Sequence, residues 1–482
     1  MSSTQPGMWL NLFQAAQSTS LPLRAQLCTA LREAIRSGAV PYPARLPASR
    51  TLAADLGISR VTVEAAYGQL EAEGYLTRRV GQGSFVAARF ARPVEAEQPL
   101  RGSQLAALSQ RGHQLVRGGG CRDPRTPLAF AAGSPDLRAF PHDTWRQLCN
   151  QRLRRDAATL AAYGDPQGYA PLRAAIAAYL QQARDVRAGA EQVLVLTSSQ
   201  QALHLLGSLL LDEGDVVWLE EPGYRGARTA LAAAGARLVA VPVDGEGMCP
   251  GDDLPPPRLI YLTPSHQYPS GCALSLTRRL ALLEIARKHG SWIIEDDYDS
   301  EFHYDGRPLP AMQGLDRHER VIYLGTFSKA LFPSLRLAYA VLPPALVEPA
   351  CTVRTIYDGH GSQLMQAVTA DFIARGHFAA HLRYMRQLYR SRRALLIEEL
   401  DAKLPHLLRV QPSPGGLQLL VELPPGSEAH LTRQAQALGV ATPSLRSLYL
   451  AEPGRDGWLL GFAALSAEEI RLGVRQLQVL RI

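Results

Sequence analysis

The sequence predicts two domains, a small one built from helices and a β-hairpin and a large α/β one with a largely parallel sheet. A chain of 482 residues is longer than a single domain with one hydrophobic core usually is. Helical patterns and a hairpin follow one another within residues 20–87, and apolar strands alternate with helices in residues 128–482. Residues 88–127 are rich in Gly, Pro and charge, which predicts a linker.

The composition is that of a folded protein, with 46% hydrophobic and 20% charged residues. No apolar run reaches about 18 residues, so we expect no membrane span, and the N-terminal residues lack the pattern of a secretory signal. The six cysteines are scattered without a C-x-x-C pair. This argues against a metal site or a disulfide framework and fits a reducing cytoplasm. A net charge of +7 permits a polyanionic partner.

Residues 21–37 predict the first helix, because four apolar side chains recur four positions apart and Gly38 follows. These side chains are Leu23, Leu27, Leu31 and Ile35. Ser49 is the expected N-cap of a short second helix that stops at Gly57, and Ser59 is the expected N-cap of a third. The third helix turns four side chains inward. They are Val63, Ala66, Tyr67 and Leu70.

After the third helix, YLTRRVGQGSFVA predicts two short strands around a Gly-Gln-Gly tip. Three helices followed by this hairpin predict a winged helix-turn-helix. Ser59, Arg60 and Thr62 begin the third helix, at the end that enters the major groove of DNA in such motifs. Arg78 and Arg79 flank the hairpin. The alternative is that these arginines are solvated surface and that the helices are only a scaffold.

Residues 46–86, LPASRTLAADLGISRVTVEAAYGQLEAEGYLTRRVGQGSFV, resemble the GntR-family DNA-binding domain almost position for position. The family's LP-x-SR-x-LA and SR-x-TV-x-x-AY-x-x-L-x-x-EG elements are both present. The resemblance implies double-stranded operator DNA as the partner. The residues that it assigns to DNA contact are Ser49, Arg50, Ser59, Arg60, Thr62, Gly81 and Gly83.

The large domain shows continuous apolar runs, as expected of strands that are buried on both faces. The expected strands are QVLVLTS, GDVVWLEE, ARLVAVPV, PRLIYLTP, SWIIEDD and RVIYLGTFS. Ligands of such folds bind at the carboxyl ends of the strands. The polar stretches found there are SSQ, EPGY, PSHQYPSG, EDDYDSEF and TFSKALFPSLR.

Lys329, one of only three lysines in the chain, lies in the last of these stretches. An amine that forms a Schiff base needs a neighbouring cation to lower its pKa. A pyridinium nitrogen needs an anionic partner, and amides at a helix start suit a phosphate. The set as a whole suits pyridoxal phosphate. Taken singly, each stretch has an ordinary explanation as a helix cap, a surface loop or a solvated lysine.

Residues 128–482 resemble the fold-type I, class I aminotransferase domain. Behind a GntR-type winged helix, they resemble the MocR/GabR subfamily of transcriptional regulators. The motifs that carry the resemblance are YGDPQG, EEPGY, TPSHQYPSG, IIEDDYDSEF, VIYLGTFSKALFPSLRLAYAVLP and LLGFAAL.

The resemblance implies that Lys329 forms an internal aldimine with pyridoxal phosphate, that Asp296 pairs with the pyridine nitrogen, and that Tyr224 stacks on the ring. It also implies that Tyr298 hydrogen-bonds the ring oxygen, with His266 or Gln267 nearby. The residues that it assigns to the phosphate are Ser199, Gln200, Ser328, Arg336 and, from the other subunit, Tyr163.

The subfamily further implies a head-to-tail homodimer, with Arg446 binding the carboxylate of an amino-acid effector. Two positions depart from its pattern. Gly226 stands where the member that senses γ-aminobutyrate has a second arginine, which argues against that effector. Ser198 stands where glycine is usual before the phosphate-binding residue, and we expect it to be tolerated if its φ is negative.

We therefore expect a transcriptional regulator that depends on pyridoxal phosphate and senses the cofactor, an amino acid or an amine through Lys329. The alternative is a genuine aminotransferase with an accessory DNA-binding domain. Motifs of the large domain do not separate the two, since both use the same lysine chemistry. The intact winged helix favours the regulator, because a metabolic enzyme has no need of it.

Overall fold

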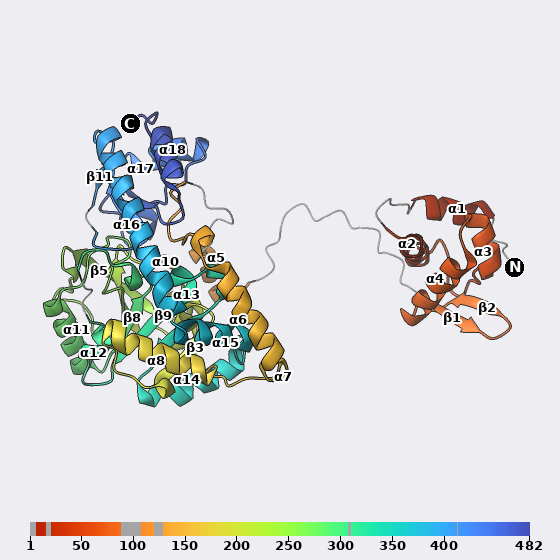
Figure 1. Ribbon diagram of the computed structural model, residues 1–482, viewed down its shortest axis with the longest axis horizontal. Helices are drawn as coiled ribbons and strands as arrows, with labels where there is room; N and C mark the ends of the chain where they lie inside the picture. Colours follow the sequence, from red (N-terminus) through yellow and green to blue (C-terminus); the bar gives the residue numbers. More distant parts are fainter. Residues whose placement is uncertain (1–5, 16–20, 88–107, 120–128, 307–309, 412) are drawn as a thin grey trace. The chain divides into compact units, whose positions relative to one another are not determined.

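In the computed structural model the chain forms two units, Met1–Leu108 and Ser109–Ile482 (Figure 1). The residues that the structure describes are 6–15, 21–87, 108–119, 129–306, 310–411 and 413–482. Most of the predicted linker lies outside them. Its described part carries α5 (Gln110–Gly118), which contacts α10 (Arg225–Ala233). None of the helices in the described ranges is long and apolar enough to cross a membrane.

The first unit contains the three predicted helices and the hairpin, preceded by one more helix. Its elements are α1 (Pro6–Ala15), α2 (Leu23–Arg36), α3 (Ser49–Leu56), α4 (Arg60–Ala72), β1 (Leu76–Arg79) and β2 (Gly83–Val86). Trp9 and Phe13 of α1 are buried together with the apolar faces of α2 and α4. As predicted, the Ser59 side chain caps α4, and Gly57 ends α3 in the left-handed conformation.

Two details of the first unit differ from the prediction. Ala48 occupies the N-cap position of α3, and Ser49 is the first helical residue. The Ser49 hydroxyl is therefore free of a capping role, and it donates to Glu64 Oε1 at 3.2 Å. Leu23, expected on the apolar face, is 49% exposed. It is the first residue of α2, one turn before the buried Leu27.

The large unit is built on an eight-stranded sheet in the order β3-β10-β9-β8-β7-β4-β5-β6. Its strands are β3 (Val193–Leu196), β4 (Val216–Glu221), β5 (Arg237–Asp244), β6 (Gly247–Met248), β7 (Leu259–Leu262), β8 (Trp292–Asp297), β9 (Val321–Thr326) and β10 (Ala338–Val341). All six predicted strands are present, and β9, β8, β7, β4 and β5 run parallel. Because β10 is antiparallel to both its neighbours, β3 shares the direction of β9.

Both faces of this sheet are covered, as the continuous apolar runs predict. Val193 and Val195 of β3 belong to one buried cluster, whereas Leu194 and Leu196 belong to another. The covering helices include α8 (Ala170–Arg184) on one side and α9 (Ser199–Leu210) on the other. The remaining helices are α6 (His142–Arg155), α7 (Ala157–Ala161), α11 (Leu276–His289), α12 (Met312–Leu315), α13 (Phe327–Ala330), α14 (Pro344–Tyr357), α15 (Gln363–Ala374), α16 (His377–Lys403), α17 (Glu428–Ala437) and α18 (Ala467–Leu477).

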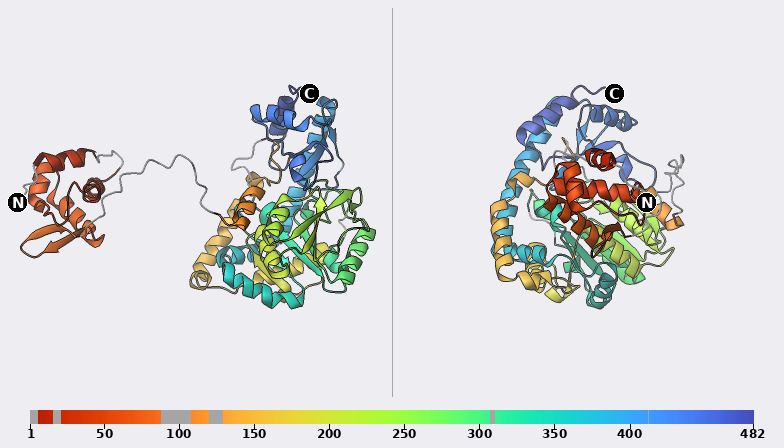
Figure 2. Two further views of the ribbon diagram at one scale, coloured as in Figure 1. Left: turned by 180° about the vertical axis from the view of Figure 1, so that it is seen from behind. Right: turned by 90° about the vertical axis from the view of Figure 1, so that its right-hand side faces the viewer.

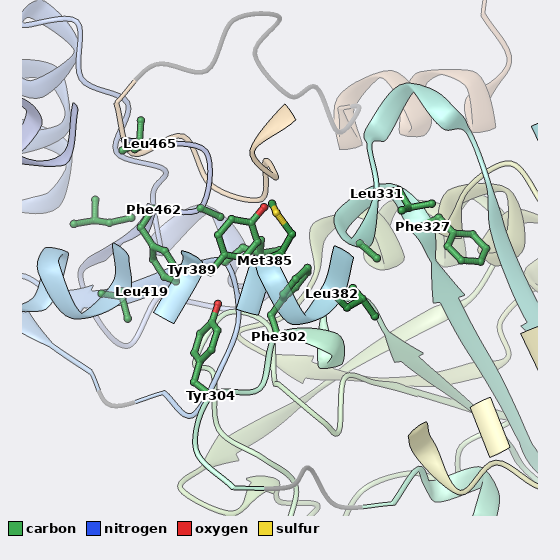
Figure 3. Close-up of a cluster of buried hydrophobic side chains, with 14 of the residues drawn as sticks. Phe302, Tyr304, Phe327, Leu331, Leu382, Met385, Tyr389, Leu419, Phe462 and Leu465 are labelled. Carbon is green, nitrogen blue, oxygen red and sulfur yellow. The ribbon is translucent and has the colours of Figure 1, made fainter. Parts of the chain in front are cut away.

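A second, antiparallel sheet lies toward the C-terminus, and the sequence did not predict it. Its strands are β11 (Arg409–Val410), β12 (Gln418–Glu422) and β13 (Gly457–Gly461). The long helix α16 passes from this sheet toward the large one (Figures 1 and 2). Figure 3 shows how the two are joined: Phe302 near the large sheet, Tyr389 of α16 and Phe462 after β13 pack in one apolar cluster.

Candidate functional site

Lys329 lies on α13, the single helical turn that follows β9 at the carboxyl edge of the large sheet. Its Nζ donates a hydrogen bond to the carbonyl oxygen of Gly133 at 2.5 Å. Gly133 has a φ of +78°, and a Cβ built on it would lie 3.0 Å from Lys329 Nζ. The positive φ favours glycine where this backbone segment lies against the amine.

Two adjacent aspartates end β8, and their surroundings differ. Burial opposes ionisation of Asp297, but the Arg184 guanidinium at 2.8 Å and two hydroxyl donors bring its pKa below the usual range. Burial raises the pKa of Asp296 to about 7, although Tyr261 Oη donates to its Oδ2 at 2.7 Å. Each aspartate keeps one oxygen, Oδ1, without a hydrogen-bond partner among the described residues. Only Asp296 also lacks a cation there, so it suits a protonated ring nitrogen.

The start of α9 and the tyrosine after β4 are in contact. Ser198 caps α9, and its φ of −169° is ordinary extended backbone, so the residue is tolerated in place of glycine as expected. Gln200 Nε2 donates to Tyr224 Oη at 3.2 Å. A Cβ built on Gly226 would lie 2.3 Å from Gln200 Nε2 and 2.4 Å from Tyr224 Cζ. A larger residue at position 226 would therefore displace the Gln200 and Tyr224 side chains from this arrangement.

The buried imidazole of His266 is surrounded by polar groups. Its Nδ1 lies 3.1 Å from both carboxylate oxygens of Asp299 and from Tyr298 Oη, and its Nε2 lies 2.9 Å from Ser413 Oγ. We assign the Nδ1 proton to the hydrogen bond with Asp299, because a carboxylate accepts and does not donate. Nδ1 then has no lone pair for Tyr298, whose hydroxyl proton is left for another acceptor.

Four further residues from the sequence prediction lie at or near the surface. Ser328 is half-buried beside Lys329, and Arg336 is exposed with a φ of 52°. Tyr163 is 99% exposed, and its ring lies edge-on to His360. The guanidinium of Arg446 pairs with Asp456 at 2.7 Å on a surface of the small sheet.

The surface of the first unit that carries the predicted DNA contacts is organised by Glu64. Its Oε1 lies 2.7 Å from Arg60 Nη2 and accepts from Ser49 Oγ at 3.2 Å. These two partners lower the pKa of Glu64. At the start of the same helix, Ser59 Oγ accepts from Thr62 N at 3.1 Å and lies 2.8 Å from the Thr62 hydroxyl. The first turn of α4 is therefore held in one arrangement.

The hairpin tip is exposed and requires glycine. Gly81 and Gly83 have φ values of +74° and +108°, which other residues rarely adopt. Val80 beside them is fully exposed, as is most of the Val61 side chain at the start of α4. Arg50 is exposed on α3. Exposed valines next to basic and hydroxyl side chains are suited to a nucleic-acid surface, where they can contact thymine methyl groups.

Family models match both units. The model of "Bacterial regulatory proteins, gntR family" covers residues 23–86, and that of "Aminotransferase class I and II" covers residues 127–477. The probable rhizopine catabolism regulatory protein MocR of Rhizobium meliloti is 40% identical over 464 residues, 96% of this chain and 94% of that protein. The chain belongs to the MocR/GabR subfamily of GntR transcriptional regulators.

Two other similar proteins bear on this MocR-type regulator. The HTH-type pyridoxine biosynthesis transcriptional regulator PdxR of Corynebacterium glutamicum is 30% identical over 465 residues, 94% of each chain. The crystal structure of LysN, an α-aminoadipate aminotransferase from Thermus thermophilus complexed with N-(5'-phosphopyridoxyl)-L-leucine, has a TM-score of 0.68 and 32% identity. It covers 77% of this chain and 94% of its own. Pyridoxal phosphate is the cofactor that this fold implies, and the uncompensated Asp296 fits it.

The structure of this MocR-type regulator adds residues that sequence reasoning missed. The ring of Tyr268 lies edge-on between Tyr224 and Tyr298, with centroids 5.9 and 6.0 Å away. The sequence held a signal, because Tyr268 belongs to the same strand-end stretch as its neighbour Gln267. The Gln267 side chain itself is buried and donates to the carbonyl oxygen of Pro222 at 2.9 Å. Tyr268, rather than Gln267, thus faces the two other tyrosines.

Proposed function

We propose that the large unit of this regulator senses pyridoxal phosphate, or an amino acid or amine that reaches it, and that the winged unit converts the result into operator binding. The observation that carries the proposal is the buried Asp296 carboxylate, uncompensated by a cation, at the same sheet edge as the amine of Lys329. Sensing and catalysis both need this pair. The DNA-binding unit in the same chain favours sensing.

The proposed roles follow from the contacts. When bound, pyridoxal phosphate supplies an aldehyde that condenses with amines. Lys329 offers the amine, and Asp296 holds a proton on the ring nitrogen. Tyr298 donates to the ring oxygen, because His266 leaves its proton available, and Tyr224 packs on the ring face. The residues proposed for the phosphate are Ser199, Gln200, Ser328 and Arg336, with Gln267 shaping the loop nearby.

For the DNA-binding unit, residues 20–87, we propose that the exposed start of α4 enters the major groove and that the hairpin tip lies along the backbone. The organising contact of Glu64 with Arg60 supports this, since it holds the arginine at the helix start. The proposed contacts are Ser49, Arg50, Ser59, Arg60, Thr62, Gly81 and Gly83. Residues 88–127 are the proposed linker to the sensing unit, residues 128–482.

We propose a head-to-tail homodimer in which Tyr163 reaches the phosphate of the partner's site. The almost full exposure of Tyr163 is compatible with this role, because it leaves the ring and hydroxyl available to a partner chain. For the effector, Arg446 is the proposed carboxylate-binding residue, and its pair with Asp456 has to be shared with that ligand. Gly226 supplies no second arginine, which argues against γ-aminobutyrate as the effector.

A genuine aminotransferase is the second candidate, and the likeness to LysN favours it. The two are separated by turnover with mixtures of amino acids and 2-oxo acids. A regulator is expected to show at most a single half-reaction per cofactor, whereas an enzyme converts many equivalents.

Operator binding measured with and without bound cofactor tests the proposal directly. DNA selected from random sequence by the purified protein serves as the operator. Loading with pyridoxal phosphate, or adding an amino acid to the loaded protein, should shift affinity for that DNA. Affinity that is the same in all three states contradicts sensing. The name of PdxR as a pyridoxine biosynthesis regulator makes the cofactor itself the first ligand to try.

A further inference from the structure

A cleft of about 550 Å³ opens on the small sheet beside β11 (labelled in Figure 1). Its apolar walls come from prolines and leucines of three separate segments, among them Leu408, Leu423 and Pro424. Its polar lining contains three arginines and two acids. They are Arg409, Arg446, Arg455, Glu422 and Asp456. None of the residues proposed to hold pyridoxal phosphate lines it.

The two acidic side chains are less exposed than the three arginines and form ion pairs with them. The Asp456 side chain is 3% exposed and the Glu422 side chain 18%, whereas the three arginine side chains are 44–79% exposed. Asp456 pairs with Arg446 at 2.7 Å, and Glu422 pairs with Arg409 at 2.8 Å and Arg455 at 3.0 Å. Each guanidinium has five N–H donors, so one carboxylate partner leaves donors for a ligand. The carboxylates fix the guanidinium groups in place, and the cleft keeps one net positive charge.

We propose that this cleft binds a small oxyanion ligand that carries two or more carboxylate or phosphate groups. Three guanidinium groups held by acids on one side match planar, paired oxygens on the other. The proline and leucine walls suit the carbon skeleton of a metabolite rather than a bare solvent ion. The cleft shares Arg446 with the proposed effector site and shares no residue with those proposed for the cofactor, so a ligand bound here competes with the effector for that arginine.

The experiment is isothermal titration calorimetry of the full-length, cofactor-loaded protein with citrate and, separately, with inorganic phosphate at low ionic strength. Citrate represents the polycarboxylates and phosphate the phosphorylated compounds. We expect one saturable site per chain for at least one of them. The double variant Arg409→Gln/Arg455→Gln, which leaves Arg446 in place, should weaken binding at least about ten-fold. The variant Arg409→Gln, at the most exposed of the three arginines, should weaken it less.

The matched control is Arg433→Gln, which removes an exposed arginine of α17 outside the cleft. It should bind as the wild type does. Lys329→Ala should also retain binding, because this site does not use the cofactor amine. Saturable binding of neither anion overturns the proposal, as does equal loss in the control. Binding that disappears in Lys329→Ala places the anion in the other pocket and overturns it as well. Circular dichroism confirms that each variant is folded, and Arg409→Gln tests the cleft even if the double variant is not.

Discussion

The candidate DNA-binding surface of the first unit and the candidate cofactor pocket of the second differ in how far their charged groups are exposed to water. The candidate DNA contacts come from residues 49–83, are largely exposed and are held by ion pairs in water, such as Arg60 with Glu64. The candidate cofactor residues come from segments between Gly133 and Ser413 and include a fully buried carboxylate, that of Asp296. The surface site depends on charge that salt screens, whereas the pocket depends on single groups in a dry environment.

This difference sets what substitutions do in each place. Exposed ion pairs contribute at most about 1 kcal/mol, so losing one leaves the fold intact and changes function gradually. A buried ionisable group without a partner shifts both stability and ligand binding, because the interior offers no water to replace the missing contact. We therefore expect sharp losses from single changes in the pocket and graded losses at the DNA surface.

The largest effect is expected from Lys329→Ala. Borohydride reduction of the loaded wild type should fix the cofactor covalently to this residue, and the variant should show no such label, because no other amine lies at the sheet edge in the described pocket. Peptide mass spectrometry measures it. The matched controls are Lys288→Ala and Lys403→Ala, which remove the two other lysines. A label on either of them contradicts the assignment.

The next effect concerns Asp296 and pH. Burial raises its pKa to about 7, whereas the unfolded chain titrates it near 4. The folded, cofactor-free protein therefore holds one more proton between those values, and the free energy of unfolding falls as pH rises from about 4 to about 7. Over three units the fall amounts to at most roughly 4 kcal/mol. The side chain introduced by Asp296→Asn cannot ionise, so the free energy of unfolding of this variant should fall less over the same pH range.

Urea unfolding of the cofactor-free protein at pH 5 and pH 8 measures this difference. Glu301, whose pKa burial also raises to about 7, contributes in the same direction in both proteins. Burial raises the pKa of Glu220 to about 7 as well, and the Asp296 charge adds to that rise, so the difference between the proteins contains Asp296 and its effect on Glu220. Equal pH dependence in the two proteins contradicts the prediction. Asp297→Asn is the contrasting variant. It leaves the buried Arg184 without its carboxylate and should destabilise the fold at both pH values.

A graded effect is expected from Arg60→Ala. Loss of one base contact costs about 1–3 kcal/mol, which is about 5- to 150-fold in affinity for operator DNA. The slope of affinity against salt should also become shallower if Arg60 contacts a phosphate. Arg36→Ala, which removes an exposed arginine at the end of α2, is the control and should bind as the wild type does. Equal binding by the Arg60 variant refutes its role in recognition.

The smallest effect is expected from Glu64→Gln. The change removes a negative charge from the surface that we propose faces DNA and releases Arg60 and Ser49 from their shared carboxylate. Affinity for random duplex DNA should rise at low salt, and discrimination between operator and random DNA should fall. Fluorescence anisotropy at two salt concentrations measures both. Unchanged discrimination shows that Glu64 does not position its partners.

The sequence alone identified much of this protein, because the signals were local. Each predicted strand of the large sheet is a short apolar run, and Ser59 and Gly57 sit where helix geometry demands a cap and a stop. The three-stranded sheet escaped prediction. Its strands lie in the sequence between helices and turns, and β11 has only two residues, so only pairing across the fold defines it.

The residue pattern by itself does not show which of two adjacent residues in the sequence performs a given role. The run EDDYD offers two aspartates for one ring nitrogen, and the family resemblance pointed to Asp296 without a physical reason. The fold supplies the reason, because it brings Arg184, 113 positions away, against Asp297 and leaves Asp296 uncompensated. The same holds for Gln267 and Tyr268, one turned into its loop and the other toward two tyrosines. Arg446 was placed by pattern, but its partner Asp456 and its cleft come from the tertiary structure. The type of each residue is known from the sequence. Its burial and the charges beside it depend on which distant segments pack against that residue in the fold.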